Sequence, residues 1–280
     1  MLAEAANATT NRSDVIAAIK QASATTGSDF NYLLDTAMRE SSLKPQAKSG
    51  TSSASGLYQF VGQTWLGMVK QYGAKYGLGA DAAVISQDSD GHFRVDTAAD
   101  RQAILALRND PKIAALMEGE YANQSKATLE TTLGRGVCGG ELYAAHFLGP
   151  GAACKLIQMN SASPNACAAS AFPAAADANK SVFFHADGSA KTVREVYDWT
   201  LKEPSGAQAL AKSAAPKASA KSYAGAASGS SDWLAGQMYE ATEPGDSSFS
   251  LLPTNSVSLT PGVLQILSSL NGPETGNRKN

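Results

Sequence analysis

The sequence has no large excess of positive or negative residues and no long apolar run. Its 280 residues include 23 Lys or Arg and 25 Asp or Glu, and the net charge of −2 gives no electrostatic basis for binding nucleic acid. No apolar stretch approaches the roughly 18 residues that a membrane-spanning helix needs. Since 43% of the residues are hydrophobic, the chain is able to bury one sizeable core. We therefore expect a globular protein with no membrane span and no nucleic-acid partner.

Cysteine and histidine are also scarce, which excludes several kinds of site. The three cysteines contain no CxxC pair, and the three histidines contain no HExxH pattern. Zinc sites and thioredoxin-like redox centres depend on such spacings. We therefore expect neither a metal nor another cofactor.

Helical patterns dominate the residues that are present. Ser13 and Ser28 are the expected N-caps of the first two helices. Alternating residues over 84–95 predict a β-hairpin, because Asp90-Gly91 is a favoured hairpin turn. The chain is thus expected to be mainly α, with helices over residues 14–24, 29–41, 63–76, 97–108, 111–126, 141–148, a segment ending near 159, and 192–202.

Glu40 is a carboxylate on the apolar face of the expected helix 29–41. It follows Leu33 by seven residues and Ala37 by three, so it lies on the same side as these apolar residues. Burial and the partial negative charge at a helix C-terminus both disfavour the ionised carboxylate and raise its pKa. A carboxyl group that stays protonated near neutral pH can act as a general acid. The alternative is a structural role, in which Glu40 pairs with a neighbouring cation or a loop amide.

The loop after Glu40 has a composition that suits sugar binding. Seven Ser and Thr residues lie between positions 41 and 55, and the glycine at position 56 lets the backbone approach a ligand closely. Hydroxyl groups, an amide and aromatic faces are suited to a sugar. For the serines alone, a flexible surface loop is the alternative. The residues that we expect to contact a sugar here are Ser49, Ser55, Gly56, Tyr58, Gln59 and Phe60.

These residues resemble the motifs of the soluble-type (family 1) lytic transglycosylases, which are relatives of goose-type lysozyme. The family pattern is a Glu-Ser pair, then hydrophobic-x-Pro-x-Ala-x-Ser, then Gly-Leu-Met-Gln. A third element, Ala-Tyr-Asn-Ala-Gly-Pro-Gly, is similar to Ala-His-Phe-Leu-Gly-Pro-Gly at residues 145–151. The residues of this chain that stand in the first two elements are Glu40-Ser41, Leu43, Pro45, Ala47, Ser49 and Gly56-Leu57-Tyr58-Gln59.

The resemblance implies a lysozyme-like helical domain over residues 12–202 that cleaves peptidoglycan. Its reaction would break the β-1,4 bond between N-acetylmuramic acid and N-acetylglucosamine and form 1,6-anhydromuramic acid. Glu40 would protonate the glycosidic oxygen and then act as a base while the muramoyl 6-hydroxyl closes the ring. Because the substrate supplies the nucleophile, the second carboxylate of an ordinary glycosidase is not needed. A hydrolytic muramidase and a wall-binding assembly scaffold with vestigial activity are the alternatives.

Two departures from the family pattern affect the expected site. Tyr58 stands where the family has Met, and His146-Phe147 replaces Tyr-Asn. In the family, that tyrosine hydrogen-bonds the catalytic carboxyl group. We expect either His146 or the nearby Tyr143 to take its role, and a satisfied core histidine is the alternative for His146.

Residues 100–149 resemble the flagellum-associated alphaproteobacterial branch of the family and some phage tail enzymes. That resemblance implies a monomeric periplasmic enzyme that opens the cell wall for the growing flagellar rod. The N-terminus has no basic and apolar signal regions, so we expect a mature form with a start Met in place of its signal peptide. In an oxidising compartment we expect a Cys154–Cys167 disulfide worth about 3 kcal/mol, with Cys138–Cys154 pairing or three free thiols as alternatives.

Residues 203–280 differ in composition from the rest of the chain. Ala, Ser, Gly, Lys and Pro dominate 204–231, and such a segment buries too little apolar surface to order itself. Two apolar islands, residues 232–239 and 260–270, are candidates for segments that fold on a partner. We expect residues 1–11 and 203–280 to be flexible, with the tail binding a flagellar rod or rod-scaffold protein. Packing of the islands on the catalytic domain is the alternative.

Overall fold

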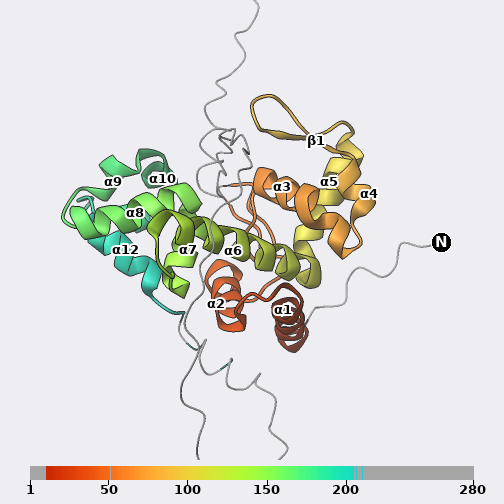
Figure 1. The fold of residues 1–280 in the computed structure, drawn as a ribbon, viewed down its shortest axis with the longest axis horizontal. Coiled ribbons are helices and arrows are strands. Elements are labelled where there is room, and N and C mark those ends of the chain that lie inside the picture. Colours follow the sequence, from red (N-terminus) through yellow and green to blue (C-terminus); the bar gives the residue numbers. More distant parts are fainter. Residues whose placement is uncertain (1–10, 51, 205, 207–209, 211–280) are drawn as a thin grey trace, which may run out of the picture. The chain divides into compact units, whose positions relative to one another are not determined.

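The mainly α fold expected from the sequence is confirmed by the computed structural model, which describes residues 11–50, 52–204, 206 and 210 (Figure 1). These residues lie in one compact unit. Two short 3-10 helices, η1 (Gly73–Tyr76) and η2 (Leu107–Asn109), continue α3 and α5. The α-helices are α1 (Arg12–Thr26), α2 (Phe30–Ser41), α3 (Gly62–Tyr72), α4 (Gly79–Ala83), α5 (Ala98–Ala106), α6 (Pro111–Leu133), α7 (Gly139–Leu148), α8 (Pro150–Ala162), α9 (Ala168–Ala171), α10 (Pro173–Ala178), α11 (Lys180–Phe183) and α12 (Val193–Leu201).

The long helix α6 contacts α1, α2, α3, α7 and α8 (Figure 1). Asp110 caps its start, because Oδ1 accepts from the amides of Lys112 and Ile113 at 2.8 and 3.0 Å. Gly134, with φ +67°, ends the helix in a left-handed conformation, beyond the end predicted at residue 126. Because neighbours cover α6 along most of its length, a polar side chain in its middle needs a buried partner.

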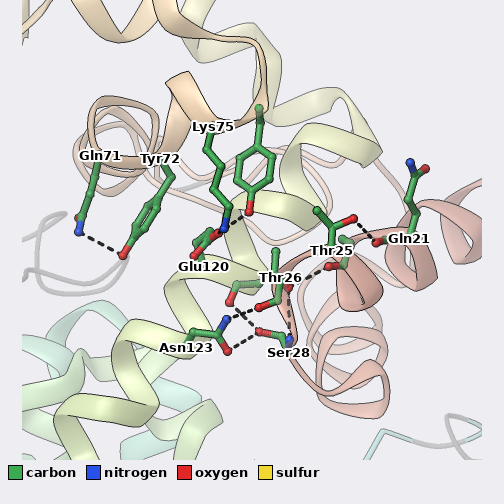
Figure 2. Close-up of polar contacts among 12 residues, drawn as sticks. Gln21, Thr25, Thr26, Ser28, Gln71, Tyr72, Lys75, Glu120 and Asn123 are labelled. Atoms are coloured by element: carbon green, nitrogen blue, oxygen red, sulfur yellow. Dashed lines mark hydrogen bonds and ion pairs between the residues drawn. The ribbon is translucent and has the colours of Figure 1, made fainter.

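Helices α1 and α6 pack closely because a glycine lies where they meet. A Cβ atom on Gly119 would lie 2.4 Å from Thr26 Oγ1, so a larger residue would force the helices apart. The Ser28 hydroxyl donates to the Gly119 carbonyl at 2.6 Å, and the Asn123 side-chain amide donates to the Thr26 carbonyl at 2.8 Å (Figure 2). These bonds join the end of α1 and the residue after its cap to the middle of α6, and they satisfy polar groups that are buried or half-buried between the two helices.

Two apolar clusters share helix α7. Tyr143 belongs to the cluster formed mainly by α1, α2, α3 and α6, and Ala144 belongs to the cluster formed by α7 to α12. Phe147 and Trp199 pack against both clusters, and their ring centroids lie 4.9 Å apart. Burial on both sides therefore fixes the position of α7 relative to α2.

The β-hairpin prediction is confirmed. Strand β1 (Ile85–Gln87) pairs antiparallel with β2 (Phe93–Val95). Gly91, with φ +84°, makes the turn, and Asp88 Oδ1 accepts from the amides of Asp90 and His92 at 3.1 and 2.9 Å. The acidic residues of this segment thus serve turn geometry.

The first two helices begin at different caps from those predicted. The N-cap of α1 is Asn11, whose Oδ1 accepts from the Ser13 amide at 2.8 Å. The N-cap of α2 is Asp29, whose Oδ1 accepts from the Tyr32 amide at 2.8 Å. The predicted cap Ser28 lies one residue earlier, and its hydroxyl is already bonded to the backbone of α6. Tertiary contact thus decided which of two good capping residues is used.

The expected Cys154–Cys167 disulfide is contradicted, because Cys138, Cys154 and Cys167 are all free thiols. Cys154 is buried on α8 within the second apolar cluster, whereas Cys167 is exposed at the N-cap of α9. A disulfide needs two Cβ vectors that face each other at close range. One thiol in the core and one at the surface do not meet that condition.

Some predictions lie outside the described residues. These are the flexibility of residues 1–10 and of the tail at 205, 207–209 and 211–280, and the binding role of the two apolar islands at 232–239 and 260–270. Of the helices that the structure does describe, none combines the length and the apolar character needed to cross a membrane.

Candidate active site

Glu40 lies in the last turn of α2, as predicted. Leu33 and Ala37 of this helix are fully buried, while the Glu40 side chain is 19% exposed. The helix ends because Ser42 and Leu43 adopt left-handed backbone conformations, with φ of 53° and 62°. The Leu43 amide closes this end by donating to the Ala37 carbonyl at 3.2 Å. Glu40 is therefore at the margin of the core, partly accessible to a ligand.

Two side chains of α7 converge on one oxygen of Glu40. The Tyr143 hydroxyl donates to Oε1 at 2.9 Å, and His146 Nε2 lies 3.7 Å from the same atom. Residues three apart on a helix share a face, which is why both reach the same carboxyl group. The hydrogen bond that we expected from either residue is thus made by Tyr143, and His146 stands beside it.

Arg39 holds Tyr143 against α12. Its guanidinium carbon lies 3.6 Å from the centroid of the Tyr143 ring, and its nitrogens donate to the carbonyls of Thr200 and Trp199 at 2.9 and 2.8 Å. Those carbonyls are at the C-terminal end of α12, where a cation is favoured. The Tyr143 ring also stacks on His146, with 5.9 Å between ring centroids and 16° between ring planes. Three helices thereby fix the donor that contacts Glu40.

The electrostatic setting of Glu40 suits a proton donor. Burial raises its pKa, and the negative charge of Glu118 also raises it. His146, the hydrogen bond from Tyr143 and the charge of Arg39 act in the opposite direction, because they stabilise the carboxylate, but the pKa stays above its usual value. Glu40 therefore keeps its proton to a higher pH than an ordinary glutamate, and its carboxylate has partners once the proton has left. A general acid that later acts as a base needs both properties.

Glu118 of α6 is a fully buried carboxylate at this site that the sequence reasoning missed. Its Oε1 accepts from the Tyr32 hydroxyl at 3.2 Å and lies 3.1 Å from His146 Nδ1. Burial of the ring lowers the pKa of His146, but Glu118 and Glu40 outweigh it and raise the pKa to about 9. The sequence does contain a signal for this residue. Glu118 directly follows the apolar run 113–117, and a carboxylate beside such a run in a helix is a candidate for burial.

The family motif residues around Gly56 shape the loop beside Glu40. Gly56 has φ +87°, and a Cβ atom there would lie 2.0 Å from the carbonyl oxygen of Arg108, so only glycine fits. The Ser41 hydroxyl donates to the Leu57 carbonyl at 2.8 Å, and the Gln59 side-chain amide donates to the Gly56 carbonyl at 2.9 Å. These bonds tie the loop to the end of α2 and hold it in place.

Two of the aromatic residues predicted to contact a sugar are instead part of the core. Tyr58 and Phe60 are at most 1% exposed, so their rings have no surface to offer a ligand. Both lie against His146: the Tyr58 carbonyl accepts a hydrogen bond from the ring, and the Phe60 ring is edge-on to it at 6.2 Å. They act on the site through the position of His146.

The two serines predicted to bind sugar have different positions. Ser55 is buried, and its hydroxyl donates to Asn109 Oδ1 at 3.1 Å, so it holds the loop against η2. Ser49 is partly exposed, and its Oγ accepts from the Ser52 amide at 3.1 Å. Ser49 and the half-buried Gln59 are therefore the predicted binding residues of this loop that a ligand could still reach.

The side chains around Glu40 are the hydrogen-bond donor Tyr143 and the basic residues His146 and Arg39. Within residues 11–50, 52–204, 206 and 210, no three His, Cys, Asp or Glu side chains are grouped so as to hold a metal ion. The chemistry that this arrangement offers is proton transfer to and from one carboxyl group, with a phenol and an imidazole beside it.

Residues 17–83 match the family model of the transglycosylase SLT domain. The matched segment runs from α1 to α4 and contains Glu40 and the loop around Gly56. The match supports a lytic transglycosylase, a class of lysozyme-like enzymes that act on the peptidoglycan of the cell wall. Tyr143, His146 and Glu118 lie on α6 and α7, outside the matched segment.

Proposed function

We propose that the protein cleaves the β-1,4 bond between N-acetylmuramic acid and N-acetylglucosamine in peptidoglycan and leaves a 1,6-anhydromuramic acid end. The observation that carries this proposal is the setting of Glu40. Its pKa is raised, its Oε1 accepts the Tyr143 hydroxyl at 2.9 Å, and it lies in the segment that matches the SLT domain. A single carboxyl group with these properties can serve as acid and then as base.

In the first step, Glu40 gives its proton to the glycosidic oxygen and the bond from this oxygen to muramic acid C1 breaks. Tyr143 and His146 stabilise the carboxylate that remains, since one donates a hydrogen bond and the other carries positive charge. In the second step, the muramoyl 6-hydroxyl attacks C1 and its proton passes to Glu40. Glu40 ends the cycle protonated, as it began.

The position of the second carboxylate favours this reaction over hydrolysis. An ordinary glycosidase places two carboxyl groups on either side of the scissile bond. Glu118 is the carboxylate that acts most strongly on Glu40, yet it is fully buried and contacts His146 and Tyr32. It is not placed to contact a sugar or to activate a water molecule on one, so a nucleophile from the substrate itself fits better.

The substitution Glu40→Gln tests the proposal. We expect loss of peptidoglycan digestion with an unchanged melting temperature, because the amide keeps the shape of the side chain but carries no acidic proton. Asp35→Asn is the matched control, since it removes a half-buried carboxylate from the same helix whose charged partners are Glu203, Arg39 and Asp29, and it leaves the contacts of Glu40 with Tyr143 and His146 in place. Mass spectrometry of wild-type products should show anhydromuropeptides. Muropeptides with a reducing muramic acid would instead mean a muramidase, and digestion by Glu40→Gln would mean that Glu40 is not the acid.

We also propose a monomeric periplasmic enzyme that opens the wall for the flagellar rod, with its tail on a rod or rod-scaffold protein. The support is the resemblance of residues 100–149 to the flagellum-associated branch. Catalytic residues would all lie within 12–202. Truncation after Lys202 should therefore leave a folded enzyme that digests purified peptidoglycan but no longer co-purifies with rod components. Loss of cooperative melting on truncation would mean that the tail is part of the core.

A further inference from the structure

Glu118 and His146 form a buried pair, and His146 lies between Glu118 and Glu40. Glu118 is 0% exposed and His146 is 2% exposed, and Glu118 Oε1 lies 3.1 Å from His146 Nδ1. The Tyr32 hydroxyl donates to the same Oε1 at 3.2 Å, which fixes the carboxylate against α2. A buried ionised carboxylate is costly unless a charge and hydrogen bonds compensate it. These contacts supply both at Oε1, whereas Oε2 is buried without a hydrogen-bond partner among the described residues, so Glu118 depends on His146 for compensation.

Both ring nitrogens of His146 face acceptors. Nδ1 faces Glu118, Nε2 lies 3.7 Å from Glu40 Oε1, and the Tyr58 carbonyl accepts a hydrogen bond from the ring. Neutral imidazole has one N–H group, whereas the doubly protonated ring has two. Acceptors on both sides of the ring therefore favour the cation.

We propose that Glu118 is a positioning residue of the active site, which holds His146 as a doubly protonated ring against the Oε1 atom of Glu40. This inference rests on the proposed function of Glu40 as acid and base. Glu118 does not touch the substrate and acts only through His146. The ring then presents a fixed positive charge to the carboxylate that forms when Glu40 gives up its proton.

The other charged or titratable side chains around His146 do not remove the positive charge of its ring. On α2, Arg39 faces Tyr143 and the end of α12, and Tyr32 faces Glu118. Tyrosines on α6, on α7 and in the loop before α3 also lie near enough to Glu118 for its charge to raise their pKa. Burial raises the pKa of each of these tyrosines, so they stay neutral: Tyr32, Tyr58, Tyr121 and Tyr143.

The charge on His146 is measured directly by ¹⁵N NMR of histidine-labelled full-length protein. His92 and His185 are the other two histidines, and single substitutions of each assign the signals. We expect the wild-type His146 ring to remain doubly protonated at pH 8 and to titrate near 9. In Glu118→Gln, which keeps an acceptor for Tyr32 but removes the charge, the ring should titrate at least about 1 pH unit lower. A wild-type ring that is neutral at pH 8, or an unchanged titration in the variant, overturns the proposal.

The catalytic readout is the pH profile of anhydromuropeptide release. In Glu118→Gln at about pH 8.5, where the wild-type ring is mostly charged and the variant ring is mostly neutral, His146 no longer stabilises the Glu40 carboxylate. We therefore expect kcat to fall about tenfold with little change in KM, and the alkaline limb of the profile to move to higher pH, because His146 affects Glu40 more than Glu118 does. Glu118→Asp, which keeps the charge, should recover part of the rate.

Glu120→Gln is the matched control for loss of a buried carboxylate on α6. Glu120 is also buried and accepts from Lys75 Nζ at 2.6 Å, in the network drawn in Figure 2. It should lower the melting temperature without moving the pH profile or the His146 titration. Equal effects of the two substitutions on the profile would overturn the positioning role. If wild-type protein releases no anhydromuropeptide, the proposed function fails, and the NMR titration still decides whether Glu118 keeps His146 charged.

Discussion

The hydrogen bond from Tyr143 to Glu40 is the contact whose removal tests the site most cleanly. Tyr143→Phe deletes one oxygen, the atom that lies 2.9 Å from Glu40 Oε1. The ring that remains still stacks on His146 and still lies under the Arg39 guanidinium. The substitution thus leaves the packing of α7 in place and changes only how well the Glu40 carboxylate is stabilised.

The size of the effect follows from the type of bond. A hydrogen bond to a charged group contributes about 1.5–3 kcal/mol, and about 1.36 kcal/mol corresponds to one pKa unit. The bond favours the ionised form of Glu40, so its loss should raise the already elevated pKa of Glu40 further. The same loss destabilises the carboxylate that forms in the transition state. We expect kcat to fall roughly 10- to 100-fold.

The assay is release of soluble muropeptides from purified peptidoglycan between pH 4 and pH 10. The alkaline limb of the Tyr143→Phe profile should lie at higher pH than that of the wild type, because the pKa of Glu40 rises. Tyr197→Phe is the control, since it deletes a hydroxyl that donates to Glu141 Oε1 at 3.0 Å, away from Glu40. A Tyr143→Phe profile that coincides with those of the wild type and of Tyr197→Phe would refute the reasoning.

Three further predictions concern stability. Gly56→Ala should lower the free energy of unfolding by roughly 3 kcal/mol or more, because its Cβ would lie 2.0 Å from the Arg108 carbonyl oxygen and φ is +87°. The control Gly50→Ala, which has open space around its Cβ position, should leave the melting temperature unchanged. Burial lowers the pKa of His146 but nearby carboxylates raise it to about 9, so His146 contributes stability that is complete below its ordinary value near 6.5 and is lost as the pH rises through 9. Urea titrations at pH 6 and pH 10 should show a loss of up to ~3 kcal/mol, and equal stabilities would contradict it. Thr192→Ala should cost about 1 kcal/mol in the same assay by removing the N-cap of α12, and no change would mean that the cap is redundant.

Local patterns were sufficient for much of the fold. The amphipathic α2, the start of α6 at residue 111, the helix α12 within the expected range 192–202 and the hairpin around Gly91 all formed as predicted. Each depends on residues within one or two turns of each other, so the sequence contains the whole interaction. The caps of α1 and α2 were wrong by one or two residues, because neighbouring Asn, Asp and Ser side chains are nearly equivalent as caps.

The binding residues were predicted less well. Composition suggested a sugar-binding role for Tyr58, Phe60 and Ser55, but the fold buries all three. An aromatic or hydroxyl group after a glycine turn is suited equally to a ligand and to the core, and exposure alone distinguishes the two. The disulfide was wrong for a related reason, since spacing along the chain does not say which way a thiol points.

The sequence by itself identified Glu40 as the candidate acid, because the residue is recognisable from a helix face, a helix end and the loop that follows, all within residues 30–60. Only the tertiary structure decided what surrounds it. Tyr143 and His146 reach Glu40 across more than a hundred residues, and Glu118 reaches His146 from a third helix. The pKa of Glu40 depends on these distant groups, because charge and desolvation act through space and not along the chain.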